Sequence, residues 1–185
     1  ISPDRNFSVS ICSKDGSEGM ALSFFKLIDE WITKNNFYHH AAISPDGEFL
    51  DIKKFSWDDL IVEEKIKTSI KQNILDLVDK QKLYVKYGIA TKRGILISGE
   101  PGTGKSLTGK IIANTVPSSF IWVTPKFLTT TASMENIFKF AREISPTILY
   151  FEDVDLYAED REEQGNRSVI LGEMLNQMDG IVAND

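Results

Sequence analysis

The chain has 185 residues, 42% of them hydrophobic, which is enough for one full domain with a sizeable core and a small appendage. Its net charge of −6 argues against a general nucleic-acid-binding surface, so we expect no nucleic-acid partner. No apolar stretch reaches membrane-spanning length and no signal-peptide pattern is found, so we expect no membrane segment in this chain. The single cysteine, Cys12, cannot form an intramolecular disulfide, which favours a reducing compartment and a cytoplasmic location.

Residues 1–52 are expected to form a small N-terminal α+β module. Residues 7–11 alternate apolar and polar side chains, which is the period of a half-buried strand. Residues 44–47 read Ser-Pro-Asp-Gly, a turn with the chemistry of a hairpin. The elements predicted for this module are, in chain order, a strand at 7–11, a helix at 18–34, and two strands at 37–43 and 48–52.

The rest of the chain alternates predicted helices and strands. The helices carry an apolar stripe at helical spacing, and the strands are short continuous apolar runs. Helices that alternate with strands indicate an α/β fold, with a parallel sheet covered by helices on both faces. The predicted elements are a helix at 63–84, a strand at 94–98, a helix at 107–115, a strand at 119–123, a helix at 133–144 and a strand at 147–151.

Residues 99–106 read Gly-Glu-Pro-Gly-Thr-Gly-Lys-Ser, a segment that we call the glycine loop. It fits the pattern G-x-x-x-x-G-K-[ST] and lies between a predicted strand and a predicted helix. Backbone N–H groups of such a loop, with the N-terminus of the following helix, face the phosphates of a nucleoside triphosphate. We expect Lys105 to reach the β- and γ-phosphates and the Ser106 hydroxyl to bind Mg²⁺. The ATP-binding residues predicted here are Gly99, Glu100, Pro101, Gly102, Thr103, Gly104, Lys105, Ser106 and Leu107.

The strand predicted at 147–151 runs directly into Glu152 and Asp153, which we call the acidic pair. A buried parallel strand delivers carboxylates to its C-terminal end, where ligands bind in open α/β sheets. One carboxylate there can hold Mg²⁺ and the other can polarise an attacking water. The expected fold class is therefore an α/β P-loop NTPase with a parallel sheet, preceded by a small α+β segment. The expected cofactors are ATP and Mg²⁺, and the predicted catalytic residues are Lys105, Glu152 and Asp153.

From about residue 55 to 180 the chain resembles the AAA subgroup of the AAA+ ATPases. Besides the glycine loop and the acidic pair, three segments match that family, at residues 55–60, 87–99 and 173–180. The resemblance implies that the backbone at Asp59 and Leu60 passes the adenine. It also implies hydrolysis of Mg-ATP coupled to remodelling of a macromolecule, with a homo-oligomer, usually a hexameric ring, as the working assembly.

The resemblance also implies a domain boundary and an incomplete domain. We expect an AAA+ large subdomain at residues 53–185, ending before the family's sensor 1 strand, arginine finger and helical lid. In the family, the sensor 1 strand lies between the strands predicted here at 94–98 and 147–151. Because the chain begins at Ile1 rather than Met, we expect it to be part of a longer protein. Arg161 and Arg167 are not expected to act as the arginine finger.

Two features depart from the family pattern. The family has Asp before Glu in the acidic pair, whereas this chain has Glu152 before Asp153. Alignment gives Glu152 the Mg²⁺ position and Asp153 the water-activating position, but Asp is shorter by one methylene, so an exchange of roles stays open. Residues 127–133 also form a shorter loop, without glycine, than the pore loop of peptide-threading relatives. This difference favours the relatives that do not thread a chain.

Four functional hypotheses follow from these patterns. The first is an ATPase that remodels an unidentified protein substrate without pore-loop threading. The alternative is a nucleotide-gated switch or scaffold that binds ATP with little hydrolysis, and the reversed acidic pair keeps this alternative open. A DNA-linked AAA+ protein is disfavoured by the acidic charge. A kinase or metabolic P-loop enzyme is least favoured, since no acceptor-substrate site is visible.

Overall fold

A computed structural model describes residues 18–35, 37–154 and 165–179 of the chain. By internal contacts the chain divides into two compact units, Ile1–Phe37 and Tyr38–Asp185. In the first unit the predicted helix is confirmed as α1 (Glu18–Asn35). The predicted strand at 7–11 and Cys12 lie outside the described residues. No helix among the residues described has both the length and the hydropathy needed to cross a membrane.

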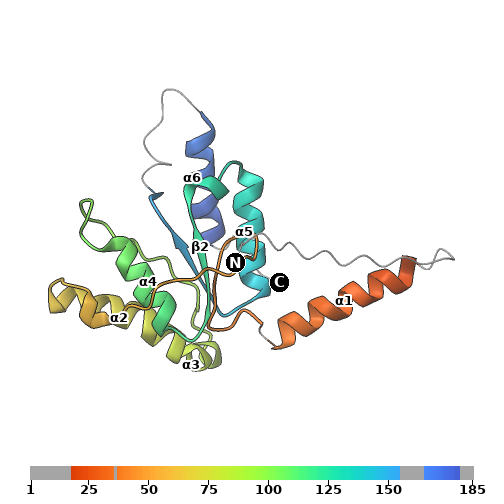
Figure 1. Cartoon of the computed structure of the whole chain (residues 1–185), viewed down its shortest axis with the longest axis horizontal. Helices are drawn as coiled ribbons and strands as arrows, with labels where there is room; N and C mark the ends of the chain where they lie inside the picture. The colour runs from red at the N-terminus through yellow and green to blue at the C-terminus, as the bar shows by residue number, and fades with distance from the viewer. Residues whose placement is uncertain (1–17, 36, 155–164, 180–185) are drawn as a thin grey trace. The chain divides into compact units, whose positions relative to one another are not determined.

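The second unit is built on a three-stranded parallel sheet with the order β1-β2-β3 (Figure 1). The strands are β1 (Ala42–Ile43), β2 (Ser119–Val123) and β3 (Thr147–Phe151). The predicted strands at 119–123 and 147–151 are confirmed, and they pair over their full length. β2 is the central strand, and all five of its residues are buried. The mixed helix and strand order and the parallel sheet confirm the expected α/β fold class.

The hairpin predicted around residues 44–47 is only partly formed. Gly47 closes the turn with φ 84° and an N–H bond to the Ser44 carbonyl at 3.0 Å. The two expected strands are reduced to β1 and a single antiparallel bridge between Ile43 and Phe49. β1 pairs in parallel with β2, and the Ala42 carbonyl also accepts from the Leu50 N–H at 2.8 Å, so residues 38–52 are tied to the second unit. A functional boundary near residue 52 stays a prediction.

Helices cover both faces of the sheet. Their bounds are α2 (Glu64–Asp79), α3 (Gln81–Lys86), α4 (Lys105–Thr115), α5 (Thr131–Glu143) and α6 (Gly165–Asp179). The single helix expected at 63–84 is two helices, because Lys80 (φ −98°, ψ 9°) leaves the helical region and separates α2 from α3. The helices expected at 107–115 and 133–144 each begin two residues earlier than predicted.

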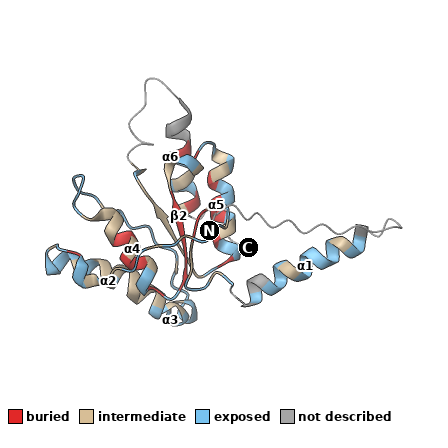
Figure 2. Cartoon of the chain, in the orientation of Figure 1, coloured by how far each residue is buried: buried red, intermediate tan, exposed pale blue. Residues whose placement is uncertain are grey.

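The side chains of β2 alternate between two hydrophobic clusters, one on each face of the sheet. Figure 2 shows β2 and parts of α4 and α5 in the colour of buried residues. Ile121 and Val123 pack into the cluster that contains the buried residues of α5 and Ile170 of α6. Phe120 and Trp122 pack on the opposite face with Ile112 of α4, where residues of α2 also contribute. The period of two along a strand therefore sets which side chains face α4 and the glycine loop.

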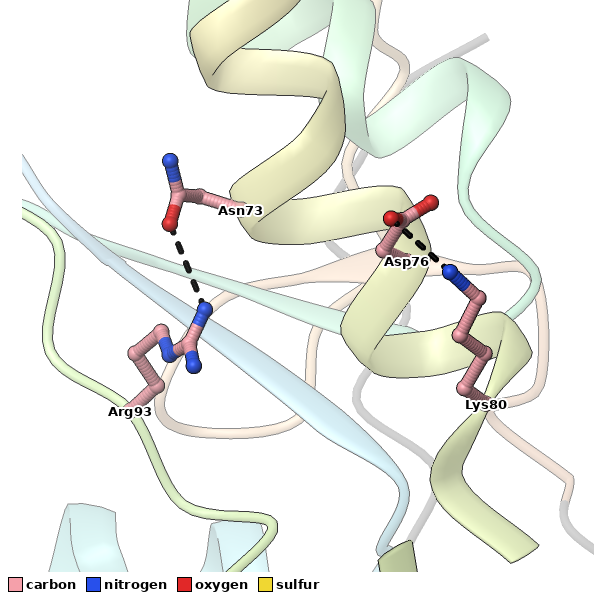
Figure 3. Close-up of polar contacts among 4 residues, drawn as sticks. All are labelled: Asn73, Asp76, Lys80 and Arg93. Carbon is pink, nitrogen blue, oxygen red and sulfur yellow. Dashed lines mark hydrogen bonds and ion pairs between the residues drawn. The ribbon is translucent and has the colours of Figure 1, made fainter. Parts of the chain in front are cut away.

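The strand predicted at 94–98 is wrong, because these residues form no ladder in the structure. Ile95 and Leu96 are 42% and 83% exposed. An extended apolar segment becomes a strand only when a neighbour pairs with it, and within the described ranges no strand lies beside this one. Side chains hold the segment instead. Arg93 donates to Asn73 of α2 at 3.2 Å (Figure 3), and Lys92 donates to the Gln177 carbonyl of α6.

Candidate nucleotide-binding site

The glycine loop connects residues 94–98 to the N-terminus of α4. Gly102 and Gly104 have φ 81° and 92°, in the left-handed region that glycine adopts without a steric penalty. Gly104 is the N-cap of α4, and its carbonyl accepts from the Thr108 N–H at 2.8 Å. The first N–H groups of a helix have no partner within it and carry a partial positive charge. The glycine loop therefore leads into backbone N–H donors at the start of α4, which can bind an anionic group.

The Lys105 side chain folds over the glycine loop. Its Nζ donates to the carbonyl oxygens of Gly99 at 2.6 Å and Glu100 at 3.0 Å. Both acceptors are neutral, and none of the ion pairs found among the described residues involves Lys105. The Thr103 side chain stabilises the loop, because its Oγ1 donates to the Glu100 carbonyl at 2.7 Å. The loop thus carries a positive charge that no carboxylate of the described residues neutralises.

The structure brings together Ser106 and Glu152, which lie 46 residues apart in the sequence. The Ser106 hydroxyl donates to Oε1 of Glu152 at 2.6 Å. The Glu152 N–H donates to the Val123 carbonyl at 2.9 Å, which extends the β2–β3 pairing by one residue and fixes the backbone of Glu152 beside β2. The two residues predicted to hold Mg²⁺ are therefore in contact. Hydroxyl and carboxylate oxygens are ligands that suit Mg²⁺, which commonly takes one or two protein ligands together with substrate phosphates and water.

Trp122 was not identified from the sequence, yet it is the second partner of Glu152. Its Nε1 donates to Oε2 of Glu152 at 3.0 Å. Trp122 pairs directly with Tyr150 in the register of β2 and β3, so Glu152 is its diagonal neighbour two residues further along β3. A signal was available in the sequence, since a buried indole N–H requires an acceptor and the next strand ends in acids.

Asp153 differs from Glu152 in both backbone and exposure. Its φ is 52°, which places a non-glycine residue in the left-handed region. Such a conformation costs on the order of 1–3 kcal/mol and occurs most often at functional sites, although Asp tolerates it better than most residues. Asp153 is exposed, whereas Glu152 is half-buried. The acidic pair therefore presents one carboxylate held by hydrogen bonds and one at the surface.

Tyr150 joins β3 to the start of α4. Its hydroxyl donates to the Lys105 carbonyl at 2.9 Å. Burial, reinforced by the negative charges of Glu152 and Asp153, raises the pKa of Tyr150 to about 12. The hydroxyl therefore stays protonated at neutral pH and remains a hydrogen-bond donor to the first residue of the helix.

Gly109 of α4 permits this close approach of Tyr150, and Gly109→Ala is expected to destabilise the protein. A Cβ at Gly109 would lie 2.7 Å from the Tyr150 ring, which is closer than real contacts allow. Overpacking of this kind costs about 1–3 kcal/mol. The matched control is Gly172→Ala in α6, where a Cβ meets nothing within 4 Å. Chemical denaturation should show a lower free energy of unfolding for Gly109→Ala than for Gly172→Ala, and equal values would contradict the packing argument.

Of the two residues predicted near the adenine, Leu60 approaches the glycine loop, whereas Asp59 bonds to Ser56. The Asp59 carboxylate accepts from the Ser56 N–H at 2.7 Å and from the Ser56 hydroxyl at 3.1 Å, and these bonds lower the pKa of Asp59. This side chain therefore caps the short helix η1 (Trp57–Asp59). Leu60 is 2% exposed, and its Cδ1 would lie 3.0 Å from a Cβ at Gly104. Leu107, in the first turn of α4, is half-buried.

Some predicted features fall partly or wholly outside the described residues. Arg161 lies outside them, and Arg167 belongs to α6 but its side chain is not described. Of the family-like segment 173–180, residues 173–179 form the end of α6, whereas Gly180 is not described. The binding and catalytic roles assigned to the residues of the glycine loop and the acidic pair stay predictions.

The sheet, the glycine loop and the Ser106–Glu152 contact define a protein of the P-loop nucleotide-binding class. Comparison with known families narrows the class, because residues 95–185 match the family described as "ATPase family associated with various cellular activities (AAA)". Residues 95–185 therefore form an AAA ATPase family domain.

Three curated relatives agree with the family match. Protein CdcH of Halobacterium salinarum is 27% identical over 169 residues, which cover 84% of this chain and 23% of that protein. The putative cell division cycle ATPase of Plasmodium falciparum is 32% identical over 71% of this chain and 12% of its own length. The ATPase family gene 2 protein of Saccharomyces cerevisiae is 28% identical over 72% of this chain and 18% of its own length. The chain thus spans less than a quarter of the length of these relatives.

Proposed function

We propose that this protein is a Mg²⁺-dependent ATPase that couples turnover to remodelling of a protein partner. The observation that carries the proposal is the 2.6 Å hydrogen bond from Ser106 to Glu152, because it joins the glycine loop to the acidic pair. Nucleotide phosphates and a carboxylate-held metal ion must meet at one point for phosphoryl transfer to be catalysed. In this chain that point lies at the C-terminal end of β3, beside the first turn of α4.

In this mechanism the residues of the chain divide into four roles. Lys105 and the backbone N–H groups of the glycine loop bind the phosphates and stabilise the negative charge that develops on their oxygens. Ser106 and Glu152 would hold Mg²⁺, which neutralises charge on the β- and γ-phosphates. Asp153 acts as the base that orients the attacking water. The backbone at Asp59 and Leu60 lies beside the adenine.

The segment between β2 and α5 supports remodelling without threading. After β2 the chain forms one short turn, η2 (Pro125–Phe127), and Leu128 is only 5% exposed because it packs in the core. Thr130 then caps α5 by accepting from the Ser133 N–H at 3.1 Å. A segment closed in this way offers no protruding aromatic residue to grip an unfolded chain. We therefore propose that the partner protein is engaged elsewhere, by a homo-oligomer of this chain.

The second candidate is a nucleotide-gated switch that binds ATP and hydrolyses little of it. The observation that favours it is the backbone of Asp153, since the base would be a short side chain on a left-handed residue at the surface. A base that cannot reach the water within hydrogen-bond distance gives slow hydrolysis. Nucleotide occupancy could then control assembly without repeated turnover.

The experiment that tests both candidates is Mg²⁺-dependent ATP turnover by the uninterrupted parent chain, measured against protein concentration beside equilibrium ATP binding. We expect turnover per molecule to rise steeply with concentration, because ring ATPases complete each site with an arginine from the neighbouring subunit. Tight ATP binding without turnover at any protein concentration would exclude the remodelling ATPase and support the nucleotide-gated switch. Absence of ATP binding would overturn both candidates.

A further inference from the structure

Glu152 is held at both of its carboxylate oxygens by different elements. Ser106, in the first turn of α4, donates to Oε1 at 2.6 Å. Trp122, in the central strand β2, donates to Oε2 at 3.0 Å. A carboxylate bonded at one oxygen can still rotate about its last torsion, whereas bonds at both oxygens select one orientation. The proposed mechanism gives a role to the Ser106 contact but none to the Trp122 contact.

The indole of Trp122 is itself fixed by packing. Trp122 is 9% exposed and belongs to the hydrophobic cluster on the α4 face of the sheet. Its ring centroid lies 4.7 Å from that of Tyr150 and 6.0 Å from that of Phe120. Because these rings limit its rotation, the Nε1–H is directed at one place. Indole is a donor only, and a hydrogen bond from it to an ionised carboxylate is stronger than one between neutral groups.

We propose that Trp122 is a positioning residue for the metal site: its indole N–H holds Oε2 of Glu152 so that Oε1 faces Ser106. This inference rests on the proposed function, because the metal site is part of it. Trp122 does not touch the metal or the nucleotide in this arrangement. It sets the apparent affinity for Mg²⁺ by keeping the Glu152 carboxylate in one orientation before the metal arrives. A residue present only for packing would influence stability and leave the Mg²⁺ dependence unchanged.

The first test is the Mg²⁺ dependence of ATP binding by the Trp122→Phe variant of the full chain. Loss of a partner that orients a metal ligand commonly weakens metal affinity by about 10- to 100-fold. We therefore expect the Mg²⁺ concentration at half-maximal effect to rise by about that factor, with ATP affinity in EDTA unchanged. In a Glu152→Gln background, Trp122→Phe should add little, because Trp122 acts through Glu152.

The matched control is Val116→Ala. Val116 belongs to the same cluster and is 3% exposed, but it lies at the C-terminal end of α4, away from Ser106. This variant should lose stability and keep the wild-type Mg²⁺ dependence. If Val116→Ala weakens Mg²⁺ dependence as much as Trp122→Phe does, general loosening of the cluster is the cause and the proposal is overturned.

A second measurement needs no folded Trp122→Phe variant. The indole N–H resonance of Trp122 can be followed by NMR in the wild-type chain and in Glu152→Gln. We expect it to move in Glu152→Gln, and to move in the wild type when Mg²⁺ is added to the nucleotide-bound protein. A resonance that moves in neither case overturns the proposal for Trp122 alone. A wild-type chain that binds no Mg²⁺-nucleotide overturns the proposed function, and this inference with it.

Discussion

The Lys105→Ala variant should bind ATP roughly a hundredfold more weakly than the wild type. Hydrogen bonds to charged groups contribute about 1.5–3 kcal/mol each, and about 1.4 kcal/mol corresponds to a tenfold change in affinity. In the structure Lys105 donates only to the neutral carbonyls of Gly99 and Glu100, so its charge is available for phosphates. Isothermal titration with ATP and Mg²⁺ measures the loss of affinity directly.

Thermal unfolding of the same variant separates a binding defect from a folding defect. The contacts of Lys105 lie within the glycine loop, so its removal should change the melting temperature little. Lys139→Ala is a suitable control, because Lys139 is an exposed lysine of α5 and its removal changes the net charge equally. Wild-type ATP affinity in Lys105→Ala would contradict the assignment of the glycine loop as the phosphate site.

The glycine loop could be predicted because its information is local. The spacing of Gly104, Lys105 and Ser106 after an apolar run is sufficient to predict a turn followed by a helix, and α4 begins at Lys105, two residues before the predicted start. The strands β2 and β3 were predicted for a related reason, since each contains a continuous run of four apolar residues, which indicates a buried strand. Each of these features depends on residues close together in the chain.

The features that were not predicted correctly depend on residues that are distant from one another in the sequence. Residues 94–98 have the composition of a strand, but a ladder requires a neighbour, and the described residues supply none. The parallel pairing of Ala42 and Ile43 with β2 was not predicted, because their partners lie about 78 residues further along. Trp122 was missed because its contact with Glu152 follows from the register between β2 and β3. Periodicity shows that a strand exists, but not which strand lies beside it.

The choice of base within the acidic pair leads to the prediction with the largest effect. Both oxygens of Glu152 are engaged, one by Ser106 and the other by Trp122, which suits a fixed metal ligand. Asp153 is exposed on a left-handed residue at the end of β3. A strained backbone that separates the second carboxylate from the first favours a distinct role for it. The structure therefore supports Asp153 as the base and Glu152 as the metal ligand.

Asp153→Asn should lower ATP turnover by roughly 10²- to 10⁴-fold, the contribution typical of a general base. ATP affinity and Mg²⁺ dependence should stay close to wild type, because Asn keeps the size of the side chain and tolerates the left-handed backbone. Single-turnover hydrolysis, with binding measured in parallel, distinguishes a chemical defect from a binding defect. Asp51→Asn, at another exposed aspartate, controls for the change in net charge. Retained turnover in Asp153→Asn would move the base to Glu152, whereas lost Mg²⁺ dependence would make Asp153 a metal ligand.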